Sequence, residues 1–271
     1  GIPSPRSLKR AATSEAGNGM NNFISSMFDL SGRTALVTGS SRGIGRAIAE
    51  TFSRAGARVL VHGCRESDVL REAACACGGI PVTGDLTDSA GVEALIEQVR
   101  NAVPALDILV LNASVQRYVT LDEFDEAEFL REFQANVGAA FRLVQAFAPA
   151  MCERKHGRII IVGSVNQFRP SPRLTVYSAT KAALVSLTVN AAKSYAPHGV
   201  TVNNLVPGVI LTDRNAEALK SDSYRGMILG QIPAGVFGEP GDCAGAALLL
   251  ASEAGRYITG IELPVTGGMH L

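Results

Sequence analysis

Short apolar runs rich in β-branched residues alternate with longer amphipathic stretches from residue 33 onward. Seven of the short runs are expected to be strands, at residues 33–38, 58–62, 80–83, 107–112, 158–162, 201–206 and 261–265. Several are apolar at successive positions, which is typical of strands buried on both faces of a parallel sheet. The longer stretches, such as residues 44–54 and 92–101, carry apolar residues three and four positions apart, as on helices that cover such a sheet.

This alternation indicates the fold class and the number of domains. Strands and helices in this order favour an α/β fold with a doubly wound parallel sheet, the Rossmann arrangement. No linker, repeat or low-complexity block divides residues 29–271, so we expect a single domain there. Its least regular stretch is residues 210–239, where glycines are scattered, and such stretches in a compact domain are usually functional.

Residues 1–28 have a different composition from the rest of the chain. Pro, Ser, Gly and Asn dominate, no apolar period is sustained, and three basic residues face only Glu15. We interpret these residues as a flexible N-terminal tail. The tail is basic and poor in acidic residues, as organelle transit peptides are, and an artificial leader or a mobile extension explains it equally well.

Composition and charge exclude several classes of partner. Lys and Arg total 25, as do Asp and Glu, so the chain offers no overall field for nucleic acid. No apolar run reaches the length of about 18 residues that a membrane span needs. The five cysteines are odd in number and lie mostly in helical stretches, which indicates reduced thiols in a cytoplasmic protein. Cys75 and Cys77 lack a second Cys or His pair at zinc-like spacing, so we expect no metal and a small-molecule partner.

A glycine-rich loop follows the first predicted strand and opens the first predicted helix. Glycine there permits a tight turn, close approach of the backbone to a pyrophosphate, and close packing of helix on strand. The free amides at the helix N-terminus then meet the anion. A plain turn is the alternative, but a second strand follows after one helix length. The loop therefore predicts dinucleotide binding through Gly39, Ser41, Arg42, Gly43, Ile44 and Gly45.

The spacing Thr-Gly-x-x-x-Gly-x-Gly, which begins at Thr38, resembles the short-chain dehydrogenase/reductase family more than the G-x-G-x-x-G of other dinucleotide binders. The resemblance covers about residues 29–271. It implies an NAD(P)-dependent oxidoreductase that interconverts a secondary alcohol and a ketone by hydride transfer. It is not specific for a substrate.

The resemblance implies further contacts with the cofactor. Asp85 and Leu86, after the third strand, match the family's adenine-contacting pair, and the alternative for Asp85 is a cap of the helix that starts near Ser89. Asn112 and Ala113 match the family's motif after the fourth strand, where Leu111 and Ser114 replace the usual Asn and Gly. After the sixth strand, the residues implied to meet the nicotinamide are Pro207, Gly208, Val209 and Thr212, for which a plain turn is the alternative.

Tyr177 and Lys181 are four residues apart, which places both side chains on one face of a helix. A free phenol has a pKa of about 10 and is a poor base near neutrality, but a nearby ammonium favours the phenolate. Ser164, at the end of the fifth strand, could donate a hydrogen bond to a carbonyl oxygen on which negative charge develops. These residues predict a proton-transfer site in which Tyr177 is the general acid and base.

The family resemblance adds two roles to this site. It implies that Lys181 also holds the nicotinamide ribose, so that Tyr177 and Lys181 contact the cofactor as well, and that Asn136 completes a water-linked proton relay. Asn136 lies in a good helical run, where an Asn without function carries a propensity cost. Taken alone, Tyr177 would be a packed aromatic side chain. The full set of catalytic candidates is Asn136, Ser164, Tyr177 and Lys181.

The turn after the second strand bears on the choice of cofactor. It reads His62-Gly63-Cys64-Arg65 and lacks the carboxylate that NAD-binding proteins use to hold the ribose hydroxyls. Arg42 and Arg65 could instead bind the 2′-phosphate of NADP. Glu66 follows one residue later and could point outward. We therefore predict NADP(H) in preference to NAD(H).

The predicted substrate pocket is largely polar. The side chains expected to line it are Ser114, Gln116, Ser164, Asn166 and Gln167, although some of them could face solvent instead. Such a lining favours a sugar acid or polyol as substrate, as in a gluconate 5-dehydrogenase, over a steroid.

Two other functions stay open at this point. Arg142 and Lys193 fall where similar 3-oxoacyl-[acyl-carrier-protein] reductases keep basic residues for the carrier, and both could equally be solvated helix charges. A protein that binds NADP but is catalytically silent and acts as a regulator belongs to another class. The intact catalytic set argues against that possibility. By resemblance alone, we also expect a homotetramer.

Overall fold

The computed structural model describes residues 22–216 and 218–271. At its centre is a seven-stranded sheet in the order β3-β2-β1-β4-β5-β6-β7, with all neighbouring strands parallel. The strands are β1 (Thr34–Val37), β2 (Arg58–Gly63), β3 (Ile80–Thr83), β4 (Ile108–Leu111), β5 (Gly157–Val162), β6 (Val200–Pro207) and β7 (Glu262–Val265). The doubly wound α/β fold predicted from the sequence is thus confirmed, and each predicted strand end agrees within a single residue.

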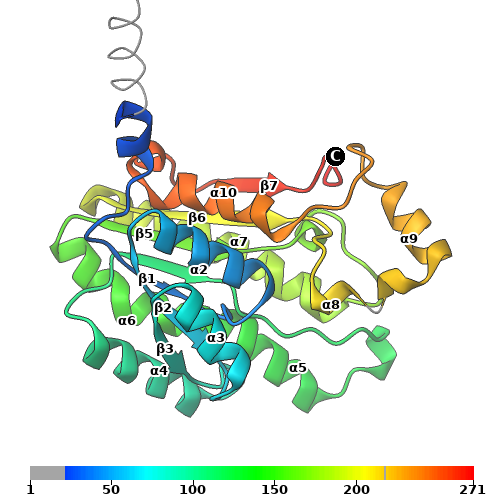
Figure 1. Cartoon of the computed structure of the whole chain (residues 1–271). Coiled ribbons are helices and arrows are strands. Elements are labelled where there is room, and N and C mark those ends of the chain that lie inside the picture. Colours follow the sequence, from blue (N-terminus) through cyan, green and yellow to red (C-terminus); the bar gives the residue numbers. More distant parts are fainter. Residues whose placement is uncertain (1–21, 217) are drawn as a thin grey trace, which may run out of the picture.

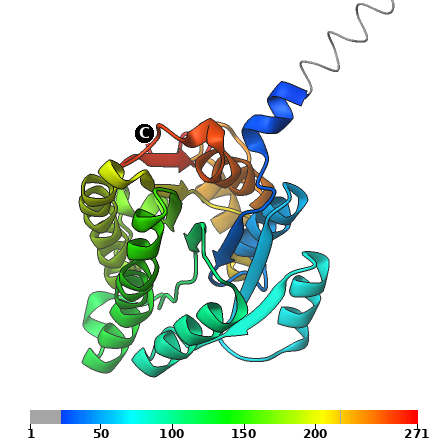
Figure 2. The same cartoon turned by 90° about the vertical axis from the view of Figure 1, so that its left-hand side faces the viewer.

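Helices cover both faces of the sheet (Figures 1 and 2). α2 (Gly43–Arg54), α3 (Asp68–Ala76) and α10 (Pro240–Ala251) pack on one face, and α4 (Ser89–Ala102), α6 (Ala139–Glu153) and α7 (Thr175–Tyr195) pack on the other. Successive strand residues enter opposite cores: Leu109 joins the α4–α6–α7 side, and Ile108 and Val110 join the α2–α3–α10 side. This two-sided burial explains the continuous apolar runs in the sequence.

The order of the strands places the site. The chain runs outward in one direction from β1 to β2 and β3, and in the other direction from β4 to β7. Between β1 and β4 the connections diverge, and ligands of open α/β sheets bind in the crevice beyond the carboxyl ends of the strands at such a point. All the loops that were predicted to bind cofactor leave the carboxyl ends of these strands.

One long predicted helix differs in detail from the structure. The helical run that was predicted around Asn136 begins as α5 (Glu126–Phe133), passes through a π-helical turn at Gln134–Gly138 and continues as α6. The Ala139 N–H bonds to the Gln134 carbonyl, five residues back. Such turns insert one residue into a helix and are frequent at functional sites. This one carries Asn136.

The predicted tail is described only in its last part. Residues 22–28 are helical and project from the domain, with every side chain exposed except the half-buried Phe28 (Figure 1). Residues 1–21 of the predicted tail lie outside the described residues.

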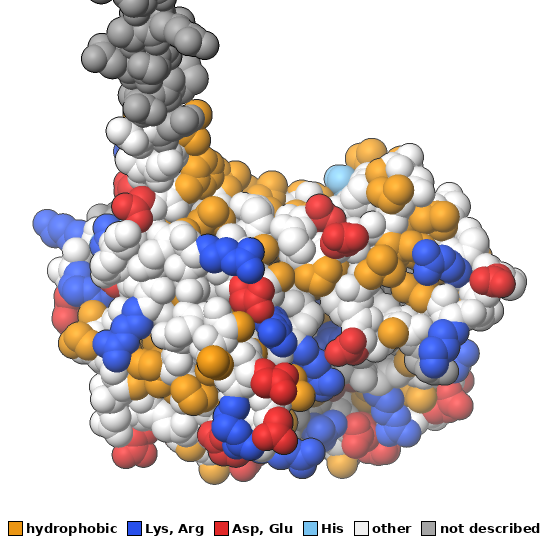
Figure 3. Space-filling model, in the orientation of Figure 1, with side chains coloured by type: hydrophobic (Ala, Val, Ile, Leu, Met, Phe, Trp, Pro, Cys, Tyr) orange, Lys and Arg blue, Asp and Glu red, His pale blue; other side chains and the backbone are white. Residues whose placement is uncertain are grey.

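Surface charge and helix composition bear on the partners. On the face seen in Figure 3, Lys and Arg side chains are interspersed with Asp and Glu, with no large area of one sign. No helix within the described part of the chain is long and apolar enough to span a membrane. Two short helices, α8 (Asp213–Ala216) and α9 (Asp222–Leu229), lie at one end of the molecule, within the stretch whose pattern was least regular (Figure 1).

Candidate active site

The glycine-rich loop after β1 is anchored to the end of β2 by His62. The Gly39 N–H donates to His62 Nδ1 at 3.0 Å, and His62 Nε2 lies 3.0 Å from the Gly84 carbonyl, to which it donates. The Ser40 Oγ accepts from the His62 N–H at 2.9 Å. Burial lowers the pKa of His62 to about 4, so the ring is neutral at physiological pH and can accept from Gly39. This role of His62 was not predicted, because its partners Gly39 and Gly84 lie more than 20 residues away in sequence.

Two glycines make room for close contacts in this loop. Gly39 has φ +63°, and a Cβ at this position would lie 2.9 Å from Ala113 Cα. A Cβ on Gly45 would meet the Gly39 carbonyl oxygen and would lie 2.5 Å from Asn112 Nδ2. Any side chain at either position would therefore displace the loop from the end of β4. This geometry fits the predicted tight turn and the close packing of α2 on the sheet.

The N-terminus of α2 has free donors. No side chain caps this helix, and its first turn carries no acidic residue. By contrast, Ser67, Asp88 and Asp125 cap the N-termini of α3, α4 and α5 with side-chain oxygens. The first-turn amides of α2 and its dipole can therefore bind an anion such as a pyrophosphate.

The two arginines that were predicted to select NADP are both exposed. Neither the Arg42 nor the Arg65 side chain has a hydrogen-bond or ion-pair partner among the described residues. Glu66, the acidic residue nearest to this turn in sequence, accepts from Arg71 Nη1 at 3.4 Å in an exposed ion pair on α3. Both arginines are thus available to a phosphate, while Glu66 is engaged elsewhere.

Asp85 is held in place by its own turn. The Thr87 N–H and hydroxyl both donate to Asp85 Oδ1, at 2.9 and 2.8 Å, and these bonds lower the pKa of the carboxyl group. The alternative that Asp85 caps the next helix is wrong, because Asp88 is the residue that caps α4. Leu86, which follows Asp85, is buried.

Asn112 ties the end of β4 to the glycine-rich loop. Its Nδ2 donates to the carbonyls of Thr38 and Gly39 at 2.9 and 3.1 Å, and its N–H bonds to Thr38 Oγ1. The side chain therefore shapes the crevice, and contact with the cofactor at this position would fall to the backbone. On the far side, Thr212 lies over the start of α2, because a Cβ on Gly43 would be 3.4 Å from its methyl group.

Pro207–Val209 continues β6 toward the same crevice. The Gly208 N–H bonds to the Val265 carbonyl, and a Cβ on Gly208 would lie 2.8 Å from Thr266 Cα. Close packing against the end of β7 therefore requires glycine here. Val209 is half-buried, and its carbonyl accepts from the Gly238 N–H.

Lys181 and Tyr177 share one face of α7, as their spacing predicted. Lys181 is 2% exposed, and its Nζ donates to the Val162 carbonyl at 2.8 Å and lies 5.3 Å from the centre of the Tyr177 ring. Burial lowers the pKa of Lys181, Arg214 lowers it further, and Tyr177 and Glu132 oppose the shift. The Tyr177 phenol has no hydrogen-bond partner among the described residues, so its hydroxyl is available to a ligand.

Ser164 ends β5 with its hydroxyl oriented by a neighbour. Its Oγ accepts from the N–H and the Nδ2 of Asn166, both at 3.2 Å. Because both contacts use the oxygen as acceptor, the hydroxyl proton remains free to donate to a ligand. Asn166, whose side chain was predicted to meet substrate, therefore orients the Ser164 hydroxyl with its Nδ2 and its backbone N–H.

The side-chain amide of Gln167 is engaged by the protein at both ends. Its Oε1 accepts from the Ser164 N–H at 3.2 Å, and its Nε2 donates to Glu262 on β7. Gln167 therefore helps to hold the backbone of Ser164 in place. The predicted direct contact with substrate does not agree with these bonds.

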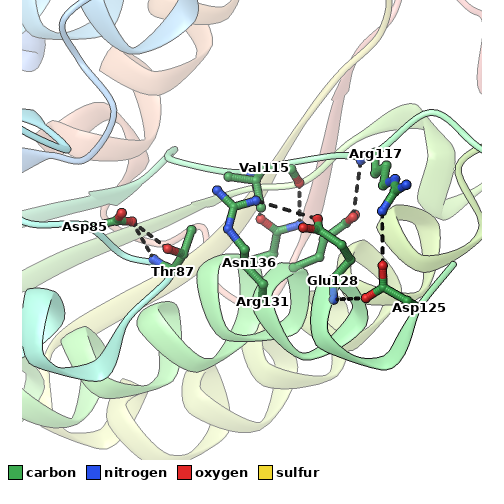
Figure 4. A network of polar contacts seen from close by, with 9 residues as sticks. Asp85, Thr87, Val115, Arg117, Asp125, Glu128, Arg131 and Asn136 are labelled. Carbon is green, nitrogen blue, oxygen red and sulfur yellow. Dashed lines mark hydrogen bonds and ion pairs between the residues drawn. The ribbon is translucent and has the colours of Figure 1, made fainter.

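Asn136 joins the π-helical turn to the segment after β4 and to α7 (Figure 4). Its Oδ1 accepts from the Val115 N–H at 2.8 Å, and its Nδ2 donates to the Val115 carbonyl at 2.9 Å and to Thr180 Oγ1 at 3.1 Å. A cavity of about 10 Å³ is lined by both Asn136 and Lys181. That volume is about the minimum for one water, as a proton relay would need.

The mouth of the crevice is spanned by Arg214 from α8. Its Nη1 donates to Ser114 Oγ at 3.1 Å and its Nη2 to the Ser114 carbonyl at 2.8 Å. No carboxylate pairs with Arg214 in the described part of the chain, although Lys181 lies within range of its charge. Beside it, an open cavity of about 410 Å³ is lined by Thr212, Asp213 and neighbouring residues of α8 and α9. Arg214 was not predicted, because its partner lies 100 residues away in sequence.

A family model and curated proteins of similar sequence both match most of this chain. The family model described as short chain dehydrogenase matches residues 33–223. A 3-oxoacyl-[acyl-carrier-protein] reductase of Haemophilus influenzae is 40% identical over 245 residues, which are 89% of this chain and 100% of that protein.

Two solved structures resemble the whole domain. A 3-oxoacyl (acyl-carrier-protein) reductase from Agrobacterium tumefaciens, with NADP bound, has a TM-score of 0.83 and 40% identity, covering 90% of this chain and 97% of that one. A gluconate 5-dehydrogenase from Burkholderia cenocepacia, in complex with NADP and tartrate, has a TM-score of 0.84 and 33% identity, covering 91% and 98%.

Proposed function

The chain belongs to the short-chain dehydrogenase family, and from that premise we propose that it is an NADP(H)-dependent enzyme acting on a small polyhydroxy acid. The family and the catalytic residues make it an NAD(P)-dependent oxidoreductase of CH–OH and keto groups. The catalytically silent alternative is therefore set aside. The observation that carries the choice of substrate is Arg214, an arginine without an acidic partner among the described residues, at the mouth of a crevice that holds Ser164 and Tyr177.

The residues of the crevice fit a nicotinamide dinucleotide. The uncapped start of α2 would hold the pyrophosphate, Asp85 and Leu86 would meet the adenine, and the segment from Pro207 to Thr212 would meet the nicotinamide. Arg42 and Arg65 would select the 2′-phosphate of NADP. When bound, the nicotinamide supplies or accepts the hydride.

Residues of this chain would donate the proton to the carbonyl oxygen in reduction and accept it in oxidation. In reduction, Tyr177 gives the proton of its phenol to the carbonyl oxygen, while the free hydroxyl proton of Ser164 bonds to the same oxygen. The Lys181 ammonium, fixed by the Val162 carbonyl, stabilises the phenolate that forms. The small cavity that Lys181 and Asn136 both line would hold one water, and that water would help to return a proton to the Tyr177 phenolate. Oxidation uses the same groups in reverse.

A carboxylate-bearing substrate suits the mouth of the crevice. The contacts of Arg214 with Ser114 are to neutral oxygens, and a carboxylate would form stronger, charge-assisted bonds with the same guanidinium. Gln116 is half-buried and has no hydrogen-bond partner among the described residues, so its amide is available to a hydroxyl group. Both features favour a sugar acid over an apolar ketone.

The second candidate is reduction of 3-oxoacyl groups on acyl carrier protein, which the names of the 40%-identical relatives favour. The two basic residues that would contact the carrier protein, Arg142 and Lys193, differ in how available their side chains are. Arg142 is engaged by Glu93 and Gln145, whereas Lys193 is exposed and has no partner among the described residues.

A comparison of initial rates tests the two candidates. The purified protein is assayed with NADPH and three ketones: a keto-sugar acid, the matching uncharged ketose, and a 3-oxoacyl thioester. We expect kcat/KM to be highest for the keto acid, by about tenfold or more over the ketose, as a charged hydrogen bond provides. Turnover of the thioester with none of the polyhydroxy ketones would contradict the proposed substrate and favour the second candidate.

Assembly and location remain proposals. A homotetramer is consistent with exposed apolar side chains on α5 and α6, where Leu130 is 57% and Phe141 is 50% exposed. Light scattering of the purified protein would measure its mass. A cytoplasmic location is proposed from the cysteine content, and all five cysteines are unpaired in the structure.

A further inference from the structure

Glu132 is a buried carboxylate beside the reaction centre. It lies on α5, is 3% exposed, and stands one helical turn before Asn136. Its Oε2 accepts from the Arg117 N–H at 3.2 Å, whereas its Oε1 has no hydrogen-bond partner among the described residues. An unpartnered buried carboxylate oxygen is costly, and groups of this kind gather at functional sites.

The segment that Glu132 holds includes Ser114, which accepts from Arg214 at the mouth of the crevice. Residues 113–118 follow β4 and belong to no helix or strand, so side chains must anchor them. Asn136 binds both backbone groups of Val115 (Figure 4). The Oε2 of Glu132 accepts from the N–H of Arg117. Glu132 and Asn136 lie on successive turns of one continuous helical run, so together they anchor the segment at two neighbouring positions.

Between these two anchor points lies Gln116. Because Val115 and Arg117 are both fixed, the backbone of Gln116 has little freedom to move. Its side chain has no internal hydrogen-bond partner among the described residues and was predicted to meet substrate. Loss of one anchor would therefore change the fit of the substrate more than the chemistry at Tyr177.

We propose that Glu132 is a positioning residue for substrate binding, which acts through the Arg117 N–H to hold Gln116 in place. The proposal rests on the proposed function to the extent that Gln116 faces the substrate. Glu132 itself touches neither the reacting atoms nor the cofactor in this proposal.

The charge of Glu132 makes this anchor sensitive to pH. Burial, with a smaller contribution from Glu128 on the same helix, raises the pKa of Glu132 to about 6. The Arg117 N–H, Arg131 on the same helix and Lys181 on α7 oppose this shift. The group is therefore ionised at neutral pH and becomes protonated as the pH falls through that value. A carboxylate accepts from a backbone N–H more strongly than a neutral acid, so acid loosens the anchor.

The test uses Glu132→Leu, Glu132→Gln and the control Glu128→Gln on the same helix, whose side chain is 37% exposed. We expect Glu132→Leu to raise KM for the ketone by about fivefold to tenfold, with kcat and NADPH affinity within about twofold of wild type. Glu132→Gln keeps an acceptor for Arg117 and should raise KM by only about twofold. Glu128→Gln should have the wild-type KM at neutral pH, where Glu132 is ionised in both proteins.

The pH profile separates positioning from mere stability. In wild type, KM should rise as the pH falls below the pKa of Glu132, near 6, and Glu132→Gln should lack this rise. If Glu132→Leu does not fold, the comparison of wild type with Glu132→Gln still decides. An unchanged KM in Glu132→Leu, or an acid rise in KM that persists in Glu132→Gln, would overturn the proposal.

A measurement without turnover keeps this proposal distinct from the proposed function. Hydrogen exchange of the amides in residues 113–118, in protein without substrate, should be faster by about fivefold or more in Glu132→Leu than in Glu128→Gln. Equal exchange in these two variants would refute the anchor even if a sugar acid is the substrate. Faster exchange, together with activity on the thioester alone, would instead uphold the anchor and contradict the proposed substrate.

Discussion

The reaction centre and the arginines around it differ in burial and in bonding. Asn136, Ser164, Tyr177 and Lys181 are 2–8% exposed, and all but the Tyr177 phenol have side-chain hydrogen bonds to the fold. The three arginines Arg42, Arg65 and Arg214 are exposed, and only Arg214 has a partner among the described residues. The centre is fixed before any ligand binds, while the arginines stay solvated until a ligand brings an anion.

The difference follows from what each region must do. Proton transfer needs donors held at fixed positions in a dry environment, where each interaction is strong. Recognition of a phosphate or carboxylate can be left to long exposed side chains, whose charge remains in water and whose individual contribution is smaller. We therefore expect substitutions to cost most at the centre and least at the exposed arginines.

Tyr177→Phe should have the largest effect. Without the phenol proton, kcat should fall by about a thousandfold, while NADPH affinity stays within about twofold of wild type. Tyr195→Phe, at the other end of α7, is the matched control and should keep its activity. Single-turnover kinetics and fluorescence titration would measure the two quantities. A fall in kcat of less than about tenfold would mean that another group supplies the proton.

The next effect is on stability and comes from His62, which is as buried as the centre. Its pKa is lowered from 6.5 to about 4 in the folded protein, so the unfolded chain binds the proton first as the pH falls. The stability contributed by the neutral ring is complete above pH 6.5 and is lost progressively toward pH 4, a loss of about 3 kcal/mol.

Urea unfolding of wild type and His62→Gln at several pH values in this window would measure the loss. Glutamine keeps one acceptor and one donor but does not titrate there, so the variant should lack this part of the pH dependence. Parallel curves for the two proteins would contradict the prediction.

At the exposed arginines, Arg42→Ala and Arg65→Ala should each raise KM for NADPH by about tenfold and leave KM for NADH nearly unchanged. Arg71→Ala is the control, because Arg71 is a nearby exposed arginine that is already paired with Glu66 and Asp68. Initial rates with both cofactors would show the change. An equal loss with NADH, or a wild-type preference for NADH, would refute the proposed selection of NADP.

The smallest effect is expected at Arg214. Arg214→Met keeps the length of the side chain and removes its charge, so KM for a keto-sugar acid should rise about fivefold while KM for the uncharged ketose stays the same. For the keto-sugar acid, the KM of Arg214→Lys should lie between that of wild type and that of Arg214→Met. If KM rises equally for the keto acid and the uncharged ketose, Arg214 closes the crevice but does not bind the carboxylate of the substrate.

Much of the fold could be predicted from the sequence because it is encoded locally. Runs such as Ile159–Ile161 are apolar on successive residues because both faces of the strand are buried. The spacing of Tyr177 and Lys181 predicts their common face, since a helix brings residues four apart together. Asn136 was identified by its match to the family's helix Asn, and no local pattern predicts the π-helical turn that carries it.

The sequence by itself determined the sheet, its flanking helices, the glycine-rich loop and the residues proposed for proton transfer, because each depends on neighbours within one element or one turn. Only the tertiary structure decided which groups support them: His62 under Gly39, Gln167 behind Ser164, Glu132 against Arg117, and Arg214 across Ser114. Most of these pairs join different elements, up to 100 residues apart in sequence. Their contacts depend on strand register and on the direction in which each side chain leaves its element, and no local pattern encodes either.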